Sequence, residues 1–211
     1  YGTVVTPTAT PDTGSSFAGW SGACGGTGGC AVTIDGDKSV TGAFTRNSYT
    51  LTVNKTGNGS GTLGNNPGGT SFLYGTVVTL TAAADTGTTF AGWSGACSGT
   101  GSCVVIIDGD KSVTGAFTLN GYALTLNKTG NGAGVLSNVP SGTTFLSGTV
   151  VTLTAQADTG SSFAGWSGSC SGLAGCVVIM DGDKVVTGAF TLNGYAVGGT
   201  VSGLVGSGLE L

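Results

Sequence analysis

Histidine is absent from this 211-residue sequence, and charged residues make up only 8% of it. Without histidine, a serine or cysteine nucleophile has no conventional general base. Only six residues are basic and the net charge is −4, so the basic surface typical of nucleic-acid binding is missing. No apolar run approaches the roughly 20 residues of a membrane-spanning helix. We therefore expect no enzymatic activity, no nucleic-acid partner and no membrane span.

Helix-favouring residues are also few, whereas glycine occupies 43 positions and threonine, valine and serine are abundant. This composition favours short strands and tight turns over helices. No Gly-X-Y period runs through the chain, which excludes collagen. Regular apolar alternation argues against disorder. The composition thus predicts an all-β protein.

A 73-residue repeat organises the chain. The hexapeptide Phe-Ala-Gly-Trp-Ser-Gly occurs three times, with its tryptophans at Trp20, Trp93 and Trp166. We divide the chain into a partial repeat at 1–47, full repeats at 48–120 and 121–193, and a tail at 194–211. A module of this size buries only roughly 60% of its unfolded surface and is marginally stable alone. The prediction is a tandem array of small antiparallel β modules, each with one short-loop disulfide.

Alternation of apolar and polar residues locates the strands of the second repeat. It predicts a first strand at 49–53, with a short strand at 61–63 pairing back on it. Further strands are expected at 75–84 and 90–93. Two more, at 103–107 and 112–118, flank an Asp-Gly-Asp sequence that is typical of a hairpin turn.

The six cysteines form three pairs, each enclosing five residues: Cys24 and Cys30, Cys97 and Cys103, Cys170 and Cys176. The enclosed residues are mostly small, so each loop can close to disulfide geometry. A structural zinc site needs four Cys or His ligands, and each repeat offers two cysteines and no histidine. We predict three disulfides within the modules, which implies an oxidising, extracellular compartment.

The aromatic residues of the hexapeptides have two possible roles. An exposed tryptophan would stack on a sugar ring. The flanking Phe, Ala and Gly instead favour tryptophan as the main core residue of a small β module. The predicted structural core comprises Phe17, Trp20, Phe90, Trp93, Phe163 and Trp166.

The sequence Asp-Gly-Asp-Lys recurs at 35–38, 108–111 and 181–184. Two carboxylates so close together are possible calcium ligands, but calcium takes six to eight oxygens, and one further Asp per repeat is available. Turn residues whose side chains cap the backbone explain the same pattern. We expect no cofactor, with calcium kept as the open alternative.

Several motifs in order resemble one known family. They are Tyr-x-Leu-Thr-x-Asn-Lys-x-Gly-x-Gly, Gly-Thr-Val-Val-Thr-Leu-Thr-Ala, Phe-Ala-Gly-Trp-Ser-Gly-x-Cys and Asp-Gly-Asp-Lys-x-Val-Thr-Gly-Ala-Phe. Together they resemble the divergent internalin-type B-repeat family of bacterial secreted and cell-surface proteins over residues 1–193. The resemblance implies a small, often tandem β-rich module without catalytic residues, found in stalks and adhesins.

These observations predict a non-catalytic structural repeat protein of the bacterial surface or extracellular matrix: a stalk, an adhesin segment or a filament subunit. The alternative is a glycan-binding accessory module of a secreted enzyme. Self-association or neighbouring modules are the expected partners, with glycans possible. A possible assembly strand lies in the tail, which would complete the first repeat of another chain by strand exchange: Tyr195, Val197, Val201, Leu204, Leu209 and Leu211. The competing interpretation is a fragment of a longer array.

Overall fold

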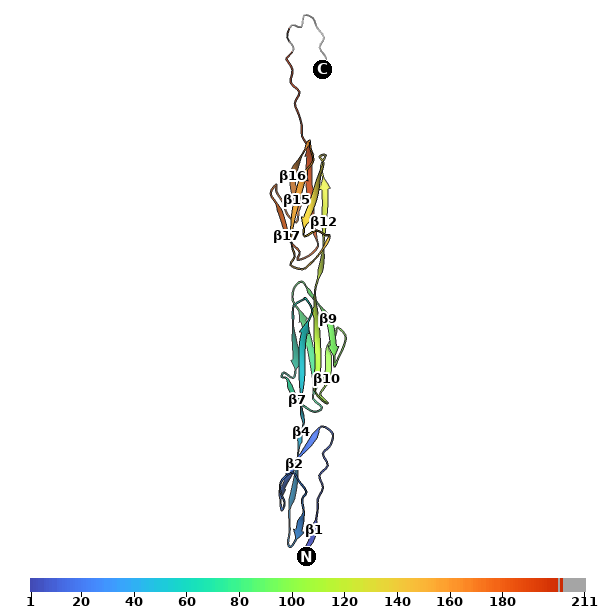
Figure 1. Cartoon of the computed structure of the whole chain (residues 1–211), viewed down its shortest axis with the longest axis vertical. Helices are drawn as coiled ribbons and strands as arrows, with labels where there is room; N and C mark the ends of the chain where they lie inside the picture. The colour runs from blue at the N-terminus through green and yellow to red at the C-terminus, as the bar shows by residue number, and fades with distance from the viewer. Residues whose placement is uncertain (201, 203–211) are drawn as a thin grey trace. The chain divides into compact units, whose positions relative to one another are not determined.

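The structure is a computed structural model that describes residues 1–200 and 202, and every regular element within them is a strand (Figure 1). The chain divides into two compact units, Tyr1–Asn120 and Gly121–Leu211. The first unit contains the partial repeat and the first full repeat. The second contains the second full repeat.

The first full repeat is a β-sandwich of two sheets. One sheet has the strand order β7 (Ser71–Leu73), β5 (Ser48–Thr56), β11 (Lys111–Leu119), β9 (Thr88–Gly95). The other has the order β10 (Cys103–Ile106), β8 (Val77–Ala84), β6 (Gly61–Asn66). A single apolar cluster draws side chains from both sheets. The all-β prediction is therefore confirmed.

The core follows the period of two that the sequence shows. On β8, Val78 and Leu80 are fully buried, whereas Val77, the first residue of the strand, is exposed. On β11, Val113 and Phe117 are fully buried. Alternate strand residues point to opposite faces, so each strand contributes one row of apolar side chains to the interior of the sandwich.

Two local pairings differ from those expected from the sequence. Strand β6 pairs antiparallel with β8 and not with β5. Strands β10 and β11 are not a hairpin either, because β10 pairs with β8 while β11 pairs with β5 and β9. The Asp-Gly-Asp segment is therefore a connection between the two sheets. Both corrections share one cause: burial of apolar faces against each other selects the sandwich over pairing between neighbours in sequence.

One strand pair in each full repeat is parallel, in contrast to the antiparallel modules expected from the sequence. Strand β5, the first of the repeat, lies beside β11, the last, with Leu51 opposite Lys111 and Val53 opposite Val113. Parallel neighbours need a long crossover connection. Here the rest of the repeat is that connection, so the pairing of its first and last strands closes the module.

The second full repeat has the same architecture. Its sheets have the orders β14 (Thr144–Leu146), β12 (Gly121–Thr129), β18 (Lys184–Leu192), β16 (Ser161–Gly168) and β13 (Gly134–Val139), β15 (Val150–Ala157), β17 (Cys176–Ile179). Strands β12 and β18 form the parallel pair. The core again joins both sheets, with Met180 in place of Ile107.

The partial repeat keeps two strands of each sheet. Strand β1 (Thr3–Val5) pairs with β3 (Val32–Ile34), and β2 (Ser15–Gly22) pairs with β4 (Val40–Arg46). Within residues 1–47 nothing takes the places of β5, β6 and β7. As a result Phe44 is 48% exposed, whereas Phe117 at the same repeat position is 0% exposed.

Candidate functional site

The tryptophan of the hexapeptide anchors the cysteine loop. Trp93 is only 5% exposed, and its ring meets that of Phe90 edge-on at 4.9 Å. Its indole Nε1 donates a hydrogen bond to the Gly101 carbonyl at 2.8 Å. Its backbone N–H donates to the Gly99 carbonyl at 2.8 Å. The loop is thus folded over the ring, and Trp93 offers no free face for stacking on a sugar.

All three disulfides form, with Cα–Cα distances of 5.7, 5.8 and 5.8 Å in chain order. In the first full repeat, Cys97 follows β9 of the four-stranded sheet, whereas Cys103 begins β10 of the three-stranded sheet. The bond therefore joins the two sheets of the sandwich at one end. This position suits a module whose core is too small to be stable alone.

A shallow pocket lies beside the cysteine loop in each repeat. Their volumes are about 290, 260 and 190 Å³ in chain order. Typical small-molecule sites span roughly 300–1,000 Å³. The residues that line the three pockets are apolar, glycine, serine, threonine or proline, and none of them titrates. The pockets therefore provide no acid, base or nucleophile pair for catalysis.

The second carboxylate of Asp-Gly-Asp-Lys binds the backbone of the first strand. The Thr50 N–H donates to Asp110 Oδ1 at 2.7 Å, and in the next repeat the Ala123 N–H donates to Asp183 Oδ1 at 2.8 Å. These partners are 60 residues apart in sequence. The aspartate therefore holds the start of β5 or β12 against the strand that ends the same repeat.

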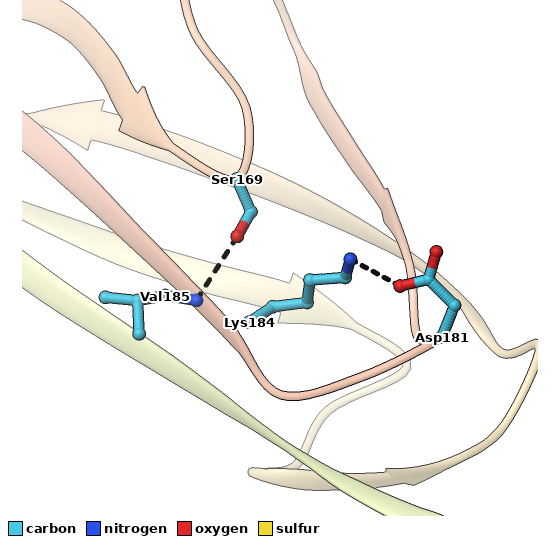
Figure 2. A network of polar contacts seen from close by, with 4 residues as sticks. All are labelled: Ser169, Asp181, Lys184 and Val185. Carbon is cyan, nitrogen blue, oxygen red and sulfur yellow. Dashed lines mark hydrogen bonds and ion pairs between the residues drawn. The ribbon is translucent and has the colours of Figure 1, made fainter. Parts of the chain in front are cut away.

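The first carboxylate of the motif pairs with its lysine. Asp108 pairs with Lys111, and Asp181 pairs with Lys184. The hydrogen bond and charge of the lysine hold the pKa of each of these aspartates below its ordinary value of 3.8. Figure 2 shows the Asp181 pair beside Ser169, whose Oγ accepts a hydrogen bond from the Val185 N–H at 3.3 Å.

These contacts assign the carboxylates of the motif to structural partners. Within residues 1–200 and 202, no group of three or more His, Cys, Asp or Glu side chains is arranged to hold a metal ion. In the two full repeats, the second aspartate of Asp-Gly-Asp-Lys caps a backbone N–H, whereas the first pairs with the lysine of the motif.

Sequence reasoning missed one further group of residues, which joins the partial repeat to the first full repeat. Asn47 alone separates β4 from β5. Its N–H donates to the Gly14 carbonyl and its carbonyl accepts from the Tyr74 N–H, both at 2.8 Å. Asn recurs at positions 120 and 193, a periodicity that was visible in the sequence but gave no indication of its partners.

The proposed assembly strand is only partly within the described residues. Tyr195 and Val197 are exposed and belong to no strand. Val201, Leu204, Leu209 and Leu211 lie outside the described residues.

The order of strands, the disulfide and the capped turn are the same in both full repeats, and comparison with known families identifies them. A family model described as the divergent InlB B-repeat domain matches residues 1–48, 49–121 and 122–194. The chain belongs to the divergent InlB B-repeat family. Neither a curated protein nor a solved structure matches it.

Membership of the B-repeat family indicates a repeat-containing bacterial surface protein. The three disulfides are consistent with an extracellular or surface location. As for the membrane, no helix long and apolar enough to cross it occurs in the part of the chain that the structure describes.

Proposed function

We propose that these B-repeats form a non-catalytic spacer in an extracellular bacterial protein, holding other parts of that protein away from the surface. The observation that carries the proposal is that each full repeat is structurally complete. Each has its own two-sheet core and its own disulfide. Repeat arrays of this kind gain length by adding units without altering the fold of each unit.

The spacer role is tested by changing the number of repeats. A surface-displayed series would carry one, two or three copies of residues 48–120 between a cell anchor and an epitope tag. Antibody access to the tag should rise with each copy. A glycine-serine linker with the same number of residues is the matched control, because the reach of a flexible chain grows only as about the square root of its length, whereas the reach of an array grows in proportion to the number of repeats. Equal access with both would contradict the spacer role.

A second candidate role, assembly by strand exchange, is favoured by the open edges of the partial repeat. Val4, Val5 and Phe44 are exposed beside the edges of β1 and β4 where a full repeat carries β6 and β5. We propose that a β5-like segment from the tail of another chain, beginning at Tyr195, occupies the edge of β4. Such a contact is heterologous and propagates into a filament unless it closes a ring.

Deleting residues 195–211 tests the exchange. The intact chain should assemble with rising concentration in analytical ultracentrifugation, and the shortened chain should remain monomeric. Assembly without the tail would contradict the proposal, as would a monomeric intact chain at high concentration. In either case, completion of the partial repeat by further sequence of a longer array would be the better explanation.

The glycan-binding alternative depended on exposed tryptophan rings. Trp93 and Trp166 are buried in their repeats, so the ring faces that a sugar would need are covered by the protein. Titration of polysaccharides against tryptophan fluorescence should accordingly leave the emission of both unchanged.

A further inference from the structure

Asn47, the single residue that links the first two B-repeats, forms hydrogen bonds with both of them. The N–H of Asn47 is bonded to Gly14, and its side-chain Oδ1 accepts a hydrogen bond from Ser16 Oγ at 2.5 Å. These two contacts attach the link to the first repeat. Its carbonyl is bonded to the N–H of Tyr74, which attaches it to the second. Bonds on both sides of one residue restrict the two backbone dihedrals about which the repeats would swing.

An aromatic ring covers the same link. The ring of Tyr74, in the first full repeat, lies against Gly14, in the partial repeat. The two are so close that a Cβ on Gly14 would be 2.0 Å from the ring Cγ. Gly14 also has a φ of +77°, a conformation that residues with a Cβ rarely adopt. The ring centroid of Tyr74 is also 6.3 Å from that of Tyr49, in its own repeat. The ring therefore has neighbours both in its own repeat and in the preceding one.

We propose that Tyr74 and Gly14 form an interaction surface between the first two B-repeats, which stiffens their junction. Its partner is the Gly-containing turn at the end of another repeat of the same kind. A single ring on a glycine covers too little area to hold two separate molecules together. The one-residue link removes that requirement, because it supplies the ring at a high effective concentration. The inference rests on the spacer function, since a spacer keeps its length only if its junctions resist bending.

The other repeats show what this tyrosine does and does not do. Tyr1 occupies the equivalent position of the first repeat and is fully exposed. Ser147 occupies this position in the second full repeat, which has the same fold as the first full repeat. A B-repeat therefore folds with serine at this position, so the ring is not required for the sandwich. Its contact with Gly14 is what distinguishes Tyr74.

Distances between spin labels on Thr41 of β4 and Ser112 of β11 test the proposal in the full chain. Both residues are exposed strand positions on either side of the junction, and labelled non-natural amino acids avoid exchange with the disulfides. The unaltered chain should give a narrow distance distribution by pulsed electron paramagnetic resonance. Tyr74→Ser and Gly14→Ala should both broaden it, the first by removing the ring and the second by displacing it. Tyr74→Phe should preserve it.

Gly160→Ala is the matched control for Gly14→Ala. Gly160 has a φ of +82° and open space where a Cβ would be built, so its substitution adds backbone strain without touching a ring. It should leave the distances between the two labels unchanged. A broad distribution in the unaltered chain, or no broadening in Tyr74→Ser, would overturn the stiff junction. The tag-access series measures reach and the label distances measure bending at one junction, so failure of the spacer role and failure of the stiff junction are distinguishable.

Discussion

The indole nitrogen of Trp93 donates a hydrogen bond to the carbonyl oxygen of Gly101 at a distance of 2.8 Å. Gly101 lies within the loop that the Cys97–Cys103 disulfide closes. The largest core side chain and the covalent link of the B-repeat therefore act on the same loop. Loss of either should free that loop, but by different physical routes.

Trp93→Ala should lower the free energy of unfolding of its repeat by about 3–5 kcal/mol, because it removes buried apolar area and leaves a cavity. Differential scanning calorimetry of the full chain would register an earlier transition for this repeat alone. Trp20→Ala is the control: Trp20 is only partly buried in the partial repeat, so its cost should be smaller. Equal losses of unfolding free energy in the two variants would mean that burial does not determine how much each tryptophan stabilises its repeat.

Removing the disulfide through Cys97→Ala with Cys103→Ala should cost about 2 kcal/mol by the chain-entropy relation, because the closed loop is short. Urea unfolding in the absence and presence of reductant would measure this cost. The unaltered chain under reduction should lose a comparable amount while keeping the cysteine side chains in place. A much larger loss in the double variant than under reduction would identify packing of Cys103 as the main contribution.

Asp110→Ala should destabilise the first full repeat by about 1 kcal/mol, since the Thr50 N–H loses a charged acceptor. Asp37→Ala is the matched change in the partial repeat, where residues 1–47 contain no counterpart of Thr50. Hydrogen exchange should show faster exchange at the start of β5 in the first variant only. Protection of β5 as strong as in the unaltered chain would contradict the proposed closure of the sandwich by Asp110.

The paired aspartates predict a pH dependence of stability. The pKa values of Asp108 and Asp181 are lower in the folded chain than the ordinary 3.8, because Lys111 and Lys184 stabilise the charged carboxylates. A lowered folded pKa contributes stability above the unfolded pKa, and that contribution is lost as pH falls through the folded pKa. Urea midpoints should therefore decline below about pH 4. Both pairs are solvent-exposed, so the decline should be small.

Asp108→Asn and Asp181→Asn in one chain provide the control for that dependence. The amides cannot titrate, so the decline in the urea midpoint at acid pH should be reduced relative to the unaltered chain. An identical decline would assign the acid sensitivity to other carboxylates.

The sequence by itself determined the extent of each B-repeat, its strand-forming segments and its disulfide. The 73-residue period, the cysteine pairs and the alternation of apolar residues on β8 were all readable, because each depends on spacing within one short segment. The disulfides could be predicted because the five residues within each cysteine pair are mostly small, so each loop can close. The preference of Trp for the core followed from its apolar neighbours.

Only the tertiary structure decided which strands are neighbours. The pairing of β6 with β8, and the parallel pairing of β5 with β11, join segments whose local sequences are compatible with several partners. The choice is made by burying Leu51, Val78 and Val113 in one core, which is a condition on the whole module. The contacts of Asp110 with Thr50 and of Tyr74 with Gly14 were hidden for the same reason. Each joins residues about 60 positions apart, and no short-range pattern in the chain specifies such a distance.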